Sequence, residues 1–369
     1  MAVSVNACVD VIAVADDNVF DILLGTLAED ITAKRNSKSI LKYRWVFHIP
    51  IFCVLYHKPK LIIKFGEFRR NLGDIYGVNT VPVLGHNCNV IDLADALKFD
   101  ECTKELLKVY EVDKTDMRDV NQSDVFAALL NIGKLHEILA MNGVLERTIK
   151  RLCENGRDIR ARNSRGKSVL HEAVLNMSSF EVFDTIISQG GDVDSTDHYG
   201  ITALLSFISK AIYYRSRMPE VVKILKLLLS QNPCIISNTD VIKKAIEYDK
   251  RKCHDVFDKT SPDDVETHYE AQRTSEKYTI AKEMCLLPWL YKYGFPVSQT
   301  DIDEIELEIP GYKTVFDINL NSPRCLKDIT RLNIRETYQG KRLFTVINAI
   351  PIPNCIKDYI LMQQFNCSG

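Results

Sequence analysis

The fold is decided by residues 166–204, which read GKSVLHEAVLNMSSFEVFDTIISQGGDVDSTDHYGITAL. A glycine turn at Gly166 precedes a short apolar helix, a second helix follows, and Gly200 begins the unit again after a step of 34 residues. Such a step is typical of stacked helix–turn–helix units. Glycine suits each turn because a positive φ costs it little. The sequence therefore predicts an all-α solenoid.

Other segments repeat this pattern less clearly, so we expect about six or seven units in all. These segments are 90–110, 125–130 together with 145–159 as one unit, 221–229 as the second helix of the Gly200 unit, 241–248 and 289–297. Residues 250–277 are very polar and read as an insertion inside one unit. Insertions in repeat proteins gather on one face, which is often a binding face. A solvated linker is the alternative for this segment.

The unit resembles the ankyrin repeat, whose core reads Gly-x-Thr-Pro-Leu-His-x-Ala, then a Leu-Leu helix, then Gly-Ala-Asp-Val-Asn. Lys167 to Ala173 and Gly190 to Asp194 carry the resemblance. It implies inner helices with small side chains that allow neighbouring units to stack. It also implies a surface suited to binding another protein.

A second informative stretch is residues 322–361, SPRCLKDITRLNIRETYQGKRLFTVINAIPIPNCIKDYIL. Ser322 and Pro323 predict the start of a helix. At about 100° per residue, this helix has two apolar stripes. They are Leu326–Thr330–Ile334 and Cys325–Ile329–Leu332. A terminal helix needs only one apolar stripe to pack on its own domain. We therefore expect Cys325, Ile329 and Leu332 to pack there, and Leu326, Thr330 and Ile334 to be free for a partner. Burial of both stripes within its own domain is the alternative.

This stretch resembles a SOCS box, whose first helix reads Leu-x-x-x-Cys-x-x-x-apolar and is followed by a Leu-Pro-apolar-Pro segment. The resemblance implies a three-helix domain that binds elongin C, with elongin B, through Leu326, Thr330 and Ile334. It also implies selection of cullin-5 with its RING subunit by the segment Ile350-Pro351-Ile352-Pro353. Thr330 stands where the family has cysteine, and isoleucine replaces leucine in the proline segment.

Together, the two resemblances divide the chain into three parts. We expect a degenerate helical or ankyrin-like region at 1–120, ankyrin repeats at 121–310 with the polar insertion around 250–277, and a SOCS box at 321–362.

Composition and cysteine usage set the broad class. The net charge of −2 gives no bias toward polyanions, so we expect no nucleic-acid partner. Eleven cysteines are scattered singly, without zinc spacing, and read as reduced intracellular thiols. The longest apolar run, Trp45 to Tyr56, is too short to span a bilayer, and residues 1–17 lack the basic start of a signal peptide. We expect a cytoplasmic or nuclear protein without a membrane partner.

Several motifs that suggest chemistry are incomplete. The run Gly166-Lys167-Ser168 lacks the phosphate-loop glycine, since Ala161 occupies that position. The pair His171-Glu172 lacks the second zinc ligand, because Leu175 stands there. The ankyrin resemblance implies instead that the His171 side chain hydrogen-bonds the backbone of the neighbouring turn. We therefore expect no catalytic residue, no metal and no cofactor.

Other charged groups read as ordinary surface. Asp192 and Asp194 fit a turn rather than acid–base work, and the cations around Lys210 and at 250–252 fit solvated faces.

The combination of the two stretches resembles the ankyrin repeat and SOCS box family. The resemblance implies a substrate-recognition adaptor of a cullin-5 RING ubiquitin ligase rather than an enzyme. One alternative is an ankyrin scaffold with a vestigial SOCS box, and another is an enzyme in the N-terminal third. We expect the turn tips at Arg162, Arg165, His198 and Tyr199 to contact an unknown protein substrate.

Overall fold

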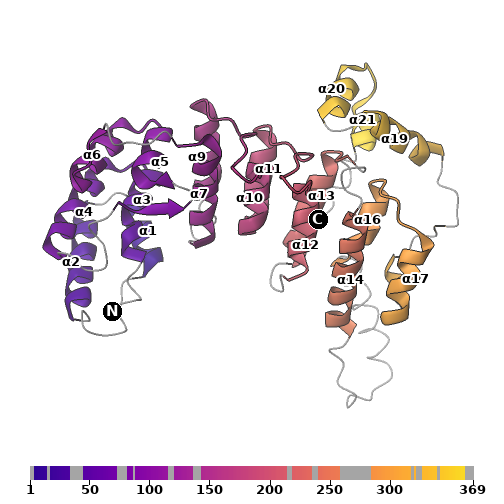
Figure 1. The fold of residues 1–369 in the computed structure, drawn as a ribbon, viewed down its shortest axis with the longest axis horizontal. Helices are drawn as coiled ribbons and strands as arrows, with labels where there is room; N and C mark the ends of the chain where they lie inside the picture. Colours follow the sequence, from indigo (N-terminus) through magenta and orange to yellow (C-terminus); the bar gives the residue numbers. More distant parts are fainter. Residues whose placement is uncertain are drawn as a thin grey trace, which may run out of the picture. The chain divides into compact units, whose positions relative to one another are not determined.

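The structure of the protein is a computed structural model. It describes residues 4–14, 17–33, 45–72, 81–85, 88–114, 120–135, 143–213, 218–234, 240–257, 284–316, 320, 326–338 and 341–361. These residues are mostly helical, which confirms the all-α class (Figure 1). The chain divides into two compact units, residues 1–163 with 176–191, and residues 164–175 with 192–369. Among the described residues, none of the helices is both long and apolar enough to cross a membrane.

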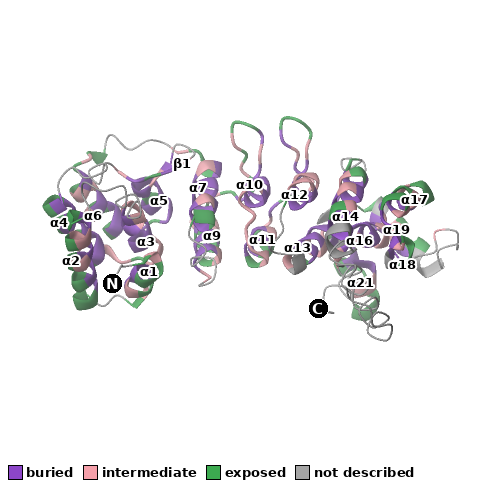
Figure 2. Cartoon of the chain, turned by 90° about the horizontal axis from the view of Figure 1, so that it is seen from below, coloured by how far each residue is buried: buried purple, intermediate pink, exposed green. Residues whose placement is uncertain are grey.

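The first unit is built from helices that pack along the chain, with α4 against both α2 and α6. Its helices are α1 (Val5–Val14), α2 (Asp17–Ala33), α3 (Ile49–Leu55), α4 (Pro59–Leu72), α5 (Val90–Ala96), α6 (Asp100–Tyr110), α7 (Gln122–Leu135), α9 (Val144–Glu154) and α11 (Phe180–Ser188). The apolar sides of these helices are buried, as the purple segments in Figure 2 show.

Local signals in the sequence explain several helix boundaries of this unit. Pro50 lies in the first turn of α3, and Pro59 begins α4, where the missing N–H of proline leaves no bond unmade. Asn89 caps α5: its side chain accepts from the backbone N–H of Ile91 at 2.8 Å and of Asp92 at 3.1 Å. Asp92 in turn accepts from the Asn89 N–H at 2.8 Å, which completes a capping box.

A short antiparallel hairpin departs from the expected pattern. Strands β1 (Val83–Gly85) and β2 (Cys88–Asn89) pair in a chain for which the sequence predicts only helices. The hairpin is too short to give the alternating apolar pattern by which a strand is recognised in a sequence.

The second unit contains the C-terminal half of the chain. Its elements are α10 (Val169–Asn176), α12 (Ala203–Ala211), α13 (Met218–Ser230), α14 (Val241–Phe257), α16 (Leu287–Lys292), α17 (Gln299–Glu308), α18 (Tyr312–Phe316), α19 (Leu326–Thr337), α20 (Lys341–Ala349) and α21 (Asn354–Leu361). Helix α12 packs on α13 and α14, and α14 packs on α16 and α17. Most of the polar segment predicted around 250–277, namely 258–277, lies outside the described residues, as do Ser322, Pro323 and Cys325.

In the second unit, a hydrogen bond from a histidine side chain joins the turn at Gly166 to the turn at Gly200. Gly166 and Gly200 have φ of 73° and 74°, which confirms the expected use of glycine. Ser168 donates its N–H to His171 Nδ1 at 3.3 Å, so the other ring nitrogen carries the proton. That nitrogen, Nε2, donates to the carbonyl of Ile201 at 2.9 Å. The predicted bond from His171 to the neighbouring turn is therefore confirmed.

A buried carboxylate joins three elements of the same unit. Asp249 on α14 is fully buried and accepts from the N–H groups of Leu286 and Leu287 at 2.7 and 3.1 Å. The hydroxyl of Tyr312 on α18 donates to it at 2.5 Å. Burial raises the pKa of Asp249 to about 6, against the lowering effect of these donors.

Candidate functional site

The last three helices, α19, α20 and α21, share a small apolar core. Leu343 and Ile347 on α20 and Ile360 and Leu361 on α21 are buried together. Leu343 and Ile347 are four residues apart, which places them on one face of α20. The half-buried side chains of Ile334 and Ile352 pack against this core.

Arg335 fixes α19 to the rest of its unit. Its guanidinium is buried and donates to the carbonyl of Leu229, which lies on α13, at 3.2 Å, and to that of Ile360 at 3.1 Å. In the opposite direction, the side-chain amide of Asn232 donates to the carbonyls of Arg335 and Tyr338 at 2.9 and 3.1 Å. The three-helix segment is thus joined by hydrogen bonds in both directions to α13 and to the segment that directly follows it.

Aromatic rings complete the surroundings of the two buried arginines on α19. The guanidinium carbon of Arg335 lies 5.6 Å from the ring centre of Tyr293, and that of Arg331 lies 4.8 Å from the ring centre of Tyr359. Burial lowers the pKa of Arg335 to about 10, a value at which the side chain is still charged at neutral pH. Arginine tolerates such a position because its planar group can stack on rings while it donates to carbonyls.

The opposite side of α19 faces solvent. Ile329 is 41% exposed, and Thr330, Asn333 and Thr337 are also exposed. The expectation that Ile329 seats the helix on its own domain is therefore wrong, although Leu332 is half-buried. The apolar pattern misleads here because arginines, counted as surface residues, form the inward face.

The predicted elongin C residues differ in their surroundings. Thr330 lies on the exposed side of α19, whereas Ile334 is half-buried against the core of the three helices. The backbone of Leu326 begins α19, and its side chain lies outside the described part of the structure.

The segment from Ile350 to Pro353 connects α20 to α21. Ile350 is 38% exposed, Pro351 and Pro353 are exposed, and Ile352 is turned toward the apolar core. The backbone N–H of Ile352 donates to the carbonyl of Ile350 at 2.9 Å, which makes a tight turn. Ile356 on α21 is 46% exposed as well.

Comparison with known families matches this part of the chain. Residues 322–361 match the SOCS box family model. A SOCS box indicates an adaptor that binds elongin B and elongin C within a cullin-RING ubiquitin ligase, and SOCS box proteins act as adaptors rather than as catalytic subunits. Comparison of the whole chain with curated proteins gives no match.

The residues predicted to contact a substrate lie at exposed turn tips. In the first unit this residue is Arg162; in the second, the residues are Arg165, His198 and Tyr199, of which Tyr199 is 83% exposed. The N–H of His198 donates to the carbonyl of Arg165 at 3.2 Å, so these two tips are adjacent. Within the described ranges, no group of three or more histidine, cysteine or acidic side chains is placed to hold a metal ion.

Arg331 and Arg335 are the residues of the SOCS box that the sequence analysis missed. Their spacing of four residues, on the side of α19 away from Thr330, is a usable signal. This spacing places two positive charges on the one face of α19 that carries neither apolar stripe.

Proposed function

We propose that the protein is the substrate-recognition adaptor of a cullin-5 RING ubiquitin ligase. It binds elongin B and elongin C through its SOCS box and a protein substrate through ankyrin repeats, which promotes ubiquitination and degradation of that substrate. One observation carries this proposal. The first helix of the SOCS box, α19, is hydrogen-bonded to α13 through Arg335 on one side and is exposed to solvent on the opposite side. The protein contributes proximity and orientation, while catalysis belongs to the ubiquitin-conjugating enzyme.

We assign the elongin C contact to the exposed side of α19, through Leu326, Thr330 and Ile334. Helical periodicity places position 326 on the same arc as Ile329, Thr330 and Asn333, which are exposed. Ile334 lies at the edge of this arc and is half-buried, so it offers part of its surface. The exposed apolar side chain of Ile329 on this side of α19 supports a docking role.

We assign the cullin-5 contact to Ile350, Pro351, Ile352 and Pro353. The arrangement supports this assignment because Ile352 anchors the turn in the apolar core, while Ile350, Pro351 and Pro353 remain exposed. A fixed turn costs less conformational entropy on binding than a free segment.

We also propose that the helices between 121 and 310 form ankyrin repeats, and that their exposed turns face the substrate. Support comes from the positive φ of Gly166 and Gly200 and from the bond between His171 and the turn at Ile201. Stacked repeats of this type present an extended binding surface.

The runner-up is an ankyrin scaffold with a vestigial SOCS box, and Thr330 is the observation that favours it. A hydroxyl placed in an apolar pocket needs a hydrogen-bond partner there, which cysteine does not. If Thr330 has weakened docking, Thr330→Cys should restore binding to elongin B/C.

Co-elution with purified elongin B/C in size-exclusion chromatography tests the proposal. The wild-type chain should co-elute, and Leu326→Asp should abolish the complex because it places a charge in an apolar contact. The matched control is Leu307→Asp, since Leu307 on α17 is 85% exposed and the change is chemically the same. The proposal is wrong if the wild type does not bind. Addition of cullin-5, with Pro351→Ala/Pro353→Ala as the variant, tests the second contact.

A further inference from the structure

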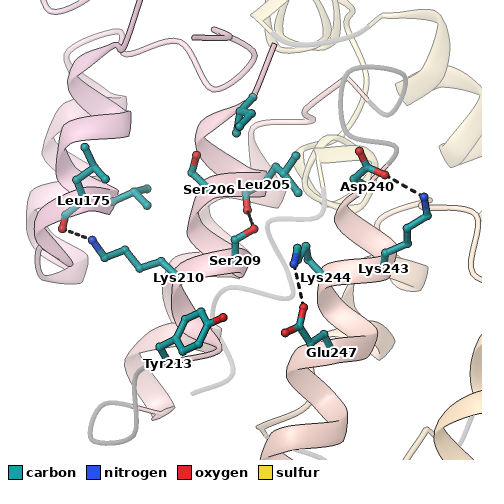
Figure 3. A pocket seen from close by; sticks show the side chains of 12 residues that line it. Leu175, Leu205, Ser206, Ser209, Lys210, Tyr213, Asp240, Lys243, Lys244 and Glu247 are labelled. Carbon is teal, nitrogen blue, oxygen red and sulfur yellow. Dashed lines mark hydrogen bonds and ion pairs between the residues drawn. The ribbon is translucent and has the colours of Figure 1, made fainter. Parts of the chain in front are cut away.

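A groove lies on three helices of the second unit, α10, α12 and α14 (Figure 3). Its volume is 720 Å³, within the range of sites that bind ligands. The sequence pattern gave no sign of it, because the groove is lined by three helices that are not consecutive in the chain.

The floor of the groove is apolar. Leu175 on α10, Leu205 on α12 and Ile201 before α12 line it, and each is half-buried rather than fully buried. Three apolar side chains that remain partly open in one hollow can each bury more surface when a partner arrives.

The rim of the groove is basic. Lys210 lies on α12, Lys243 and Lys244 lie on α14, and the carboxylates among the lining residues are Asp240 and Glu247. Figure 3 shows these side chains around the hollow, with Lys243 bound to Asp240 at 3.2 Å and Lys244 bound to Glu247 at 2.9 Å.

A fourth cation strengthens this charge. Arg251, one turn further along α14, also binds Glu247 at 3.1 Å, so that one carboxylate serves two cations. The lining residues themselves carry three cations and two carboxylates, and the ammonium of Lys210 donates to the carbonyl of Leu175. The ion pair between Lys243 and Asp240 is well exposed, at 81% and 61%, so its exchange for an incoming carboxylate costs little.

We propose that this groove binds an acidic segment of the protein substrate, with an apolar side chain of that segment seated on the floor and its carboxylates paired with Lys210, Lys243 and Lys244. The inference rests on the proposed adaptor function, for which it names the chemical class of the substrate. Charge complementarity between the basic rim and acidic side chains sets the choice of partner.

An acidic peptide fits the groove better than a nucleic acid does. Single-stranded nucleic acids bind grooves that carry aromatic side chains for base stacking. Here the lining holds one aromatic residue, Tyr213, whose ring already lies 5.0 Å from the guanidinium carbon of Arg251. The aliphatic floor suits an aliphatic or aromatic side chain of a peptide.

Selection from a random displayed peptide library on the full-length chain tests the proposal. Enriched peptides should combine aspartate or glutamate with an apolar residue. A fluorescent copy of the best peptide should bind Lys243→Glu/Lys244→Glu at least about tenfold more weakly than the wild type. Leu205→Gln should also weaken binding, since it removes an apolar contact from the floor. The matched control is Lys104→Glu/Lys150→Glu, which reverses two exposed lysines on α6 and α9.

The outcomes separate clearly. The proposal is overturned if no peptide is enriched, if the enriched peptides are not acidic, or if the groove and control variants lose affinity equally. It is also overturned if single-stranded DNA binds the groove as tightly as the best peptide. Binding of the same preparations to elongin B/C is measured in parallel, so that a failure of the groove is distinguishable from a failure of the adaptor function.

Discussion

At the scale of single residues, Arg335 decides how the SOCS box is held. Its guanidinium is buried between the carbonyls of Leu229 and Ile360. Hydrogen bonds to charged groups contribute about 1.5–3 kcal/mol each. Arg335→Met keeps an unbranched apolar stem but leaves both carbonyls without this donor. We expect the free energy of unfolding in urea to fall by about 2–4 kcal/mol.

The control for this prediction is Arg70→Met, since Arg70 on α4 is exposed. It should change the free energy of unfolding by less than about 0.5 kcal/mol. An equal effect of the two substitutions would show that the buried bonds of Arg335 contribute nothing.

The role of Arg335 could not be predicted from the apolar pattern. Pattern reading assigns arginine to the surface, because an unpaired buried charge is costly. Tertiary contacts reversed this assignment by supplying two carbonyls and a tyrosine ring. Ile329 was misassigned for the same reason. The buried arginines set the rotation of α19, and Ile329 therefore lies on the exposed side.

At the scale of elements, Gly166 and Gly200 offer a matched pair. Both have a positive φ, so alanine costs about 1–2 kcal/mol at either position. A Cβ at Gly166 would also lie 2.9 Å from the backbone nitrogen of His198, whereas a Cβ at Gly200 would meet nothing within 4 Å. Thermal or urea unfolding should therefore show a larger loss of stability for Gly166→Ala than for Gly200→Ala. The reverse order would contradict the described packing of these turns.

Asp249 predicts a pH dependence of stability. Its pKa is raised from 3.8 to about 6 in the folded protein, so the folded state binds more protons than the unfolded state between these values. The contribution of Asp249 to the free energy of unfolding is therefore greatest below about pH 4. It falls by about 3 kcal/mol as the pH rises to about 6.

Comparison with Asp249→Asn isolates this contribution. The difference in free energy of unfolding between wild type and variant should decrease from pH 4 to pH 6 and stay level from pH 7 to pH 8. A difference that is constant from pH 4 to pH 8 would contradict the raised pKa.

The elements differ in how well the sequence predicted them. The helices around Gly166 and Gly200 were predictable because glycine turns, apolar period and a 34-residue step agree. The exposed tip of Tyr199 followed from the same pattern. The hairpin of β1 and β2 and the groove on α10, α12 and α14 were not predictable, because a strand pair this short has no period and the groove depends on contacts between distant helices.

At the scale of the whole molecule, the proposed adaptor carries two binding surfaces in one chain. The SOCS box presents the exposed side of α19 and the turn from Ile350 to Pro353. The helices before it present a basic groove with an apolar floor. An adaptor needs both a ligase contact and a substrate contact, and a scaffold with a vestigial box would keep the second alone.

The most direct test of this account is the molar mass of the assembled complex, measured by light scattering after size-exclusion chromatography. The sample mixes the full-length chain with elongin B/C and the N-terminal domain of cullin-5. We predict one peak whose mass is that of the chain, elongin B, elongin C and the cullin domain together, one copy of each. A chain that elutes alone, separate from elongin B/C and the cullin domain, would contradict the account.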